Sequence, residues 1–173
     1  MTPAAVRLAA AATAALAAAC AGAAARSPLE RMPFPCTPPA GQLPPLEGVR
    51  RPEVFFLVPR DMIKGWPLNR YEITYGIPGR QLSAELTREF QPVRPPRDAV
   101  YETCSLAVGG RRAEVLAYQD YPSVAGRYVL TAQWRDVYAG RDFVLRVRAR
   151  DEKTYDELRS VLFTVSFPAD SAR

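Results

Sequence analysis

Two of the three cysteines lie in positions from which they could form a disulfide. Cys36 stands in a proline-rich stretch, and Cys104 stands in a strand-like stretch in phase with Leu106 and Val108. If the chain is exported, it enters an oxidising compartment in which such pairs persist. We therefore predict a Cys36–Cys104 disulfide, worth up to about 4 kcal/mol because it closes a long loop. The alternative is that Cys104 is a buried small apolar residue and Cys36 a free thiol.

Arginines occupy alternate positions of the stretch FVLRVRAR, residues 143–150. Its apolar residues alternate with them, so a register slip of one residue would bury three arginines, and the register is well determined. The candidate binding residues for an anionic partner are Arg146, Arg148 and Arg150, extended by Arg135 from the neighbouring strand. The alternative, which we favour for most of these arginines, is a solvated surface with acidic neighbours, where ion pairs contribute little.

The residue types exclude several kinds of catalytic site. Without any histidine, the chain cannot form a Ser-His-Asp or Cys-His system or a histidine-ligated zinc site. Cys36 and Cys104 do not form a CxxC pair, and Gly109-Gly110 lies in a predicted hairpin rather than before a helix. Acidic residues at 151–157 suit a helix start. We predict no catalytic residue, metal or cofactor; the alternative is a small envelope hydrolase or transferase that works through carboxylates.

The N-terminal stretch 1–19 has the layout of a secretory signal. Arg7 is followed by a run of alanine and leucine that is shorter than the ~20 apolar residues of a membrane-spanning helix. A basic start, an apolar centre and small residues at the end are typical of a cleaved signal peptide. We therefore expect residues 1–19 to be removed.

Leu16-Ala17-Ala18-Ala19-Cys20 resembles the lipobox of bacterial lipoproteins. In that family the peptidase cuts before the cysteine, which carries a diacylglycerol. The resemblance implies that Cys20 is the lipid attachment site and, because Ala21 rather than an aspartate follows it, that the protein faces the periplasm from the outer membrane. The alternative is ordinary cleavage after a small residue within 19–25, which would give a secreted or soluble periplasmic protein.

The net charge and the expected location of the protein together indicate its partners. The net charge of +5 favours anionic partners such as phospholipid headgroups. We expect the membrane, reached through the N-terminal lipid, and an envelope protein as partners. We expect no nucleic acid, because the protein is exported, and no metal.

The chain divides into a tether and one folded domain. Residues 20–51 include PFPCTPPAGQLPPLEG, in which prolines exclude a helix or a central strand and favour an extended spacer. The folded domain spans 52–168 and a tail 169–173. Strands are predicted at 53–59, 71–79, 127–134, 143–150 and 163–167, with a helix that starts after Asp151 and buries Tyr155, Leu158 and Leu162. Leu82, Leu86 and Phe90 recur at helical spacing, and we predict a helix or an irregular strand over 80–93.

Gly109-Gly110 joins two strand-like runs in YETCSLAVGGRRAEVLAYQ, residues 101–119. A two-residue Gly-Gly loop favours a tight hairpin. The predicted register places Val108 opposite Arg111, Leu106 opposite Ala113, Cys104 opposite Val115 and Tyr101 opposite Tyr118. The fold class that follows is α+β, a mostly antiparallel sheet with a C-terminal helix packed on it.

The stretch LAVGGRRAEVLAY, a strand ending in Trp134, and FVLRVRARDEKTYDELRSVLFTVSF are together similar to the PsbP-like fold over about residues 52–168. In that group a hairpin is followed by two long strands, a helix and a last strand. Bacterial members are often lipoproteins, and better-known relatives are binding or assembly subunits. The resemblance implies a non-catalytic binding or assembly module.

Overall fold

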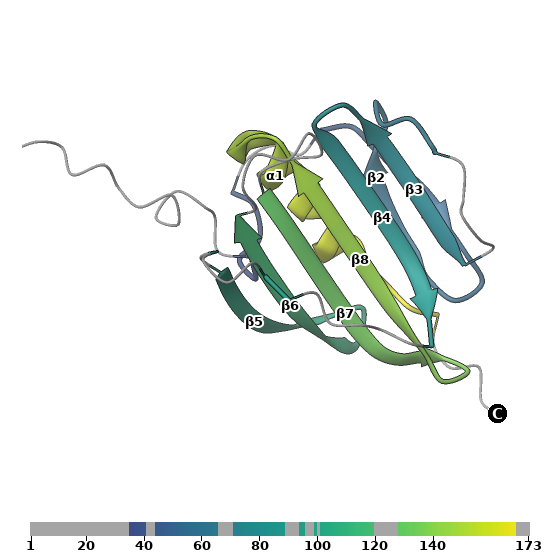
Figure 1. Ribbon diagram of the computed structural model, residues 1–173. Helices are drawn as coiled ribbons and strands as arrows, with labels where there is room; N and C mark the ends of the chain where they lie inside the picture. The colour runs from purple at the N-terminus through teal and green to yellow at the C-terminus, as the bar shows by residue number, and fades with distance from the viewer. Residues whose placement is uncertain are drawn as a thin grey trace, which may run out of the picture.

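The computed structural model describes residues 35–40, 44–65, 71–88, 94, 95, 99, 101–119 and 128–168. In this part of the chain a six-stranded antiparallel sheet has the order β3-β4-β8-β7-β6-β5. Its strands are β3 (Glu72–Ile77), β4 (Arg80–Thr87), β5 (Tyr101–Val108), β6 (Arg111–Gln119), β7 (Tyr128–Tyr138) and β8 (Arg141–Ala149). β5 to β8 form a meander that returns across the sheet, so that β8 pairs with β4 (Figure 1).

A second layer covers one face of this sheet. It consists of the hairpin β1 (Leu46–Arg50) and β2 (Phe55–Pro59), the helix α1 (Glu152–Arg159) and the 3-10 helix η2 (Ser160–Thr164), all behind the sheet in Figure 1. Phe55 and Ser166 exchange two backbone hydrogen bonds, which attach β2 to the C-terminal segment. The fold is therefore α+β with mostly antiparallel strands and a C-terminal helix, as predicted. No helix in the described residues has the length and apolar character needed to cross a membrane.

The hairpin β5–β6 has the predicted register. Val108 pairs with Arg111, Cys104 with Val115 and Tyr101 with Tyr118. The turn places Gly109 at φ 63° and Gly110 at φ 76°, values that glycine adopts without steric cost. The backbone of the C-terminal segment passes so close that a Cβ on Gly109 would lie 2.7 Å from the carbonyl oxygen of Val165. Glycine is therefore required here by conformation and by space.

The core lies between the two layers. The predicted inward residues of β8 are all buried: Phe143, Leu145, Val147 and Ala149. Trp134 of β7 packs against Phe143, with ring centroids 5.4 Å apart, and Phe167 packs against both rings. Tyr155, Leu158 and Leu162 close the core from the helical side, which confirms the predicted apolar stripe.

Asp151 caps the helix as predicted, since its side chain accepts a hydrogen bond from the Thr154 N–H at 2.9 Å. The α-helix ends at Arg159, and the chain continues as the 3-10 helix η2 to Thr164. Predicting a strand at 163–167 was wrong, because Phe163 belongs to η2 and only Ser166 forms a bridge. Apart from this bridge, the alternating apolar residues pack on the sheet and do not form a strand of their own.

Of the two alternatives predicted over 80–93, a helix or an irregular strand, the strand is formed at 80–87, where β4 pairs with both β3 and β8. Leu82 and Leu86 are four residues apart, a spacing that also fits one side of a strand, and Ala84 between them is buried with them. The folded part also begins before residue 52, because β1 starts directly after Pro45 and pairs with β2 along the edge of the second layer.

Candidate binding groove on the outer face of the sheet

The face of the large sheet opposite α1 is built from aligned rows of side chains. One row runs from Gly76 through Gln81 to Arg148, and the next from Thr74 through Ser83 to Arg146. β3 and β4 are joined by the tight turn at Pro78-Gly79, which fixes this register. Residues far apart in the sequence are thus brought side by side by the pairing of β4 with β8.

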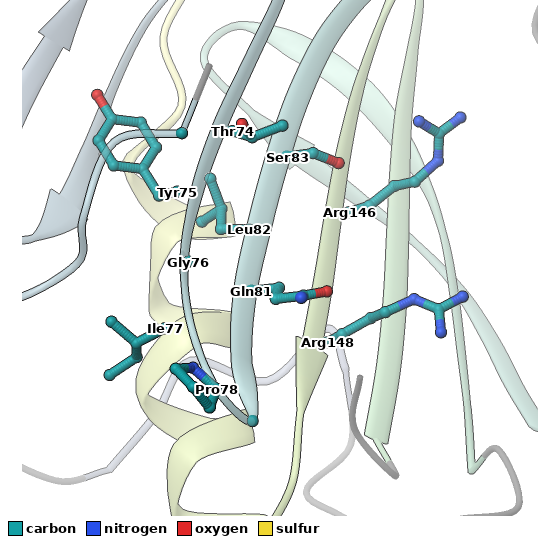
Figure 2. A pocket seen from close by; sticks show the side chains of 12 residues that line it. Thr74, Tyr75, Gly76, Ile77, Pro78, Gln81, Leu82, Ser83, Arg146 and Arg148 are labelled. Atoms are coloured by element: carbon teal, nitrogen blue, oxygen red, sulfur yellow. The ribbon is translucent and has the colours of Figure 1, made fainter. Parts of the chain in front are cut away.

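A groove of about 740 Å³ follows these rows (Figure 2). Gly76 has no side chain, so the surface is hollow between the hydroxyl-bearing row and the turn at 77–79. The described lining comprises Gly65, Thr74, Tyr75, Gly76, Ile77, Pro78, Gly79, Gln81, Leu82, Ser83, Arg146 and Arg148. Its polar side-chain groups are the three hydroxyls of Thr74, Tyr75 and Ser83, one amide and two guanidinium groups, and no carboxylate is among these residues.

The outer wall of the groove is the segment 63–65, which covers the edge of β3. The Gly65 N–H donates to the Thr74 carbonyl and the Gly76 N–H to the Ile63 carbonyl, each at 2.8 Å. Gly65 lies directly against the Thr74 hydroxyl, and any Cβ at this position would collide with it. The wall is therefore held at a fixed distance from the sheet.

Arg146 and Arg148 form the opposite wall. Arg146 is one-third exposed (33 %), and its Nη1 donates to the Glu85 Oε2 at 3.1 Å. Figure 2 shows that the side chains of Arg146 and Arg148 both extend away from β3 and β4, so their aliphatic stems border the groove and their guanidinium groups lie at its far side. The arginines therefore contribute apolar surface as well as charge.

Of the four arginines predicted as one binding surface, Arg135 lies apart from the others. Arg150 follows the end of β8, is exposed, and donates its N–H to the Gly79 carbonyl at 2.8 Å. Arg135 is exposed at the other end of β7, where its Nη2 donates to the Glu114 Oε2 at 3.0 Å. The register explains the separation, since Arg146 stands opposite Thr131 and Arg135 follows the Trp134–Phe143 pair. Only Arg146 and Arg148 border the groove.

The predicted disulfide Cys36–Cys104 is present, with the two Cα atoms 6.2 Å apart. It attaches the segment 35–40 to β5. The adjacent Thr37 carbonyl accepts a hydrogen bond from the buried Arg159 of α1, which also pairs with Asp156. The predicted lipid site, Cys20, lies outside the described residues.

Sequence reasoning missed the side chains of β3 and β4 that form the groove. Thr74, Gly76, Gln81 and Ser83 alternate with apolar residues on both sides of Pro78-Gly79, a pattern that fits a hairpin with one polar face. The aromatic side chains contribute unequally to this surface. Tyr118 is buried, and burial raises the pKa of Tyr75, whose side chain is partly buried. Trp66 and Tyr121 lie outside the described residues.

A deep pocket with two carboxylates would have favoured the carboxylate-dependent enzyme. The groove has no described carboxylate, and a second cavity has one, Glu53. In the described part of the chain no three potential metal ligands of the His, Cys, Asp or Glu type form a group that could hold a metal ion. No protein-family model matches the sequence, and no curated protein matches it at a significant level.

Proposed function

We propose that this protein is an envelope lipoprotein, anchored through Cys20 in the outer membrane, whose PsbP-like domain is a non-catalytic binding or assembly module. The observation that carries this proposal is the groove across β3, β4 and β8. It has a volume of about 740 Å³, it lies on a paired sheet, and its wall at 63–65 is held by backbone hydrogen bonds. Its partner is a segment of another envelope protein.

The lining suits recognition of a polypeptide. The hydroxyls of Thr74 and Ser83 and the amide of Gln81 both donate and accept hydrogen bonds, as peptide groups require. Gly76 lets a partner approach the backbone of β3 closely. The stems of Arg146 and Arg148 supply apolar contact, and the charge of Arg148 at the far side favours an acidic segment.

The order of elements supports the PsbP-like assignment. The hairpin β5–β6 is followed by the long strands β7 and β8, the helix α1 and a last segment that bridges to Phe55. This is the order on which the sequence resemblance rests.

The anchor is tested with Cys20→Ala in the full chain. The wild-type protein should incorporate a fatty-acid probe and sediment with membranes, whereas the variant should be unlabelled and soluble in the periplasm. An unlabelled wild-type protein would contradict lipidation at Cys20 and leave secretion as the explanation.

The groove is tested by photo-crosslinking from Ser83 in intact envelopes. Gly76→Tyr adds a ring at the groove, and its Cβ is accommodated, because a Cβ there would lie 3.6 Å from the Gln81 Cγ, an ordinary contact. The matched control, Ala107→Tyr, adds the same ring to the exposed far edge of the sheet. We expect one specific adduct that is lost in Gly76→Tyr and kept in Ala107→Tyr. An adduct that persists in Gly76→Tyr would remove the groove from the interface.

A further inference from the structure

The two layers separate at the turn between β1 and β2, and a cavity of about 340 Å³ opens there. It lies between residues 51–54 on one side and strands β3, β4 and β8 on the other. Because it is on the inner face of the sheet, it is a different place from the groove, which lies on the outer face.

The floor of the cavity is entirely apolar. It is formed by buried side chains that are at most 6 % exposed, namely Val54, Phe56, Ile73, Ala84, Leu86 and Phe143. None of these side chains carries a polar atom, so only an apolar group can enter without losing hydrogen bonds to water. The volume is near the lower end of the range for ligand pockets, about 300–1,000 Å³, which leaves room for one ring or an acyl chain of medium length.

The mouth of the cavity is aromatic and mostly cationic. Tyr71 and Tyr138 line it together with Arg51 and Glu53. The guanidinium of Arg141 lies over the ring of Tyr71, with its Cζ 4.1 Å from the ring centroid. Arg51 and Glu53 line the opening, and the Arg141 guanidinium lies next to it against Tyr71, so two positive charges and one negative charge stand near the opening. This balance favours an anionic group at the surface.

Tyr138 reaches the mouth through an irregular stretch of β7. The register shifts between Trp134 and Tyr138, so that residues 135–137 stand opposite Asp142 alone. Asp136 and Ala139 adopt left-handed backbone conformations, with φ of 46° and 47°. The Asp142 carboxylate holds this bulge by accepting the Asp136 N–H at 2.9 Å. Such bulges re-aim side chains, and here the bulge precedes the half-exposed ring of Tyr138.

We propose that this cavity binds a medium-chain carboxylate, whose acyl chain occupies the apolar floor and whose carboxylate contacts Arg51 and Arg141 at the mouth. Tyr71 and Tyr138 pack along the first part of the chain. The site is independent of the proposed groove and would exist whether or not the groove binds a protein.

The test uses the full-length protein and isothermal titration with decanoate and with decanol. Arg141→Gln should weaken decanoate binding about tenfold or more, as expected for loss of a charge-assisted contact, and should leave decanol binding unchanged. Tyr138→Ala should weaken both ligands, because it removes apolar contact. The matched control Arg112→Gln lies on the exposed part of β6 and should change neither.

The outcomes separate this proposal from the groove. Gly76→Tyr should leave decanoate binding intact. The carboxylate site is overturned if decanoate does not bind the wild-type protein. It is also overturned if decanoate binds Arg141→Gln and Tyr138→Ala as tightly as it binds the wild type. Binding of decanol alone would also overturn it, because the anionic end would then have no role. Thermal unfolding of each variant verifies that the fold is retained, and Tyr138→Phe, which keeps the ring, should bind as the wild type does.

Discussion

The Nη1 of Arg159 donates a hydrogen bond to the carbonyl oxygen of Thr37, across 122 positions of sequence. Arg159 is almost fully buried, and its Nη2 pairs with the Asp156 Oδ1 on the same helix. The N-terminal segment is therefore attached to α1 by a buried guanidinium and to β5 by the adjacent disulfide.

Arg159→Met should lower the free energy of unfolding by about 2 kcal/mol, because a buried charge-assisted bond and an ion pair are lost while the stem length is kept. Chemical denaturation measures the change, and amide exchange of Cys36, Thr37 and Ala40 should become faster. Arg135→Met, an exposed arginine, is the control and should change stability by less than about 1 kcal/mol. An Arg159→Met variant as stable as the control would contradict the attachment.

Removing the disulfide should destabilise the domain by about 2–4 kcal/mol, because the bridge closes a loop of 68 positions and restricts the unfolded chain. The variant Cys36→Ser/Cys104→Ser, made in a Cys20→Ala background, is compared with that background by denaturation with and without a thiol reductant. The reductant should lower the stability of the background protein to that of the variant and leave the variant unchanged. If the reductant leaves the stability of the background protein unchanged, the bridge is absent in solution.

Patterns within hairpins were sufficient to predict much of the sheet. Gly109-Gly110 determined the register of β5 and β6, and the alternation of arginines determined which side of β8 faces the core. Both features are local, since each depends on neighbouring residues only. The sequence at 80–87 was ambiguous for the opposite reason. Its structure depends on a long-range interaction, because the segment forms a strand by pairing with β8, more than fifty positions away.

Tyr155→Phe should leave stability unchanged or raise it by up to about 1 kcal/mol. The Tyr155 hydroxyl is fully buried and has no hydrogen-bond partner among the described residues, and a buried unpaired hydroxyl is unfavourable. The same burial raises the pKa of this hydroxyl, so it stays neutral at any ordinary pH. Tyr138→Phe, at a half-exposed ring, is the control in thermal unfolding. A loss of more than about 1 kcal/mol in Tyr155→Phe would reveal a partner in solution.

Asp151 should make the free energy of unfolding of the domain depend on pH in the acidic range. The hydrogen bond from the Thr154 N–H lowers the pKa of this carboxyl below the usual value of about 3.9. Since the folded state binds the proton more weakly than the unfolded state, the contribution is complete above about pH 4 and is lost as the pH falls through the folded pKa.

At neutral pH, Asp151→Ala should cost about 1 kcal/mol, and the difference from wild type should shrink on acidification. Asp151→Asn keeps a capping acceptor without a titrating group, so its difference from Asp151→Ala should not vary with pH. Denaturant titrations at pH 3 to 7 measure both. A constant difference between wild type and Asp151→Ala would show that the cap does not titrate.

The groove was predictable only in part. Arg146 and Arg148 could be assigned to the outer face of β8 from alternation alone, but their neighbours come from strands whose pairing is long-range. Arg135 illustrates the limit, since its separation from Arg146 follows from the pairing of β7 with β8, in which Arg146 stands opposite Thr131 and Arg135 follows Trp134. The cavity under the β1–β2 turn likewise requires the packing of two layers, which no single stretch encodes.

The disulfide also decides how tension on the chain before residue 36 would reach the domain. A pull there passes through one covalent bridge into Cys104, in the middle of the edge strand β5. The chain between the two cysteines lies outside this load path and cannot lengthen while the bridge is intact, although its 68 positions would span about 230 Å if extended. The oxidised domain is thus a short, stiff link between whatever holds its N-terminal side and whatever pulls on the chain after Cys104, and the reduced domain is a long, compliant one.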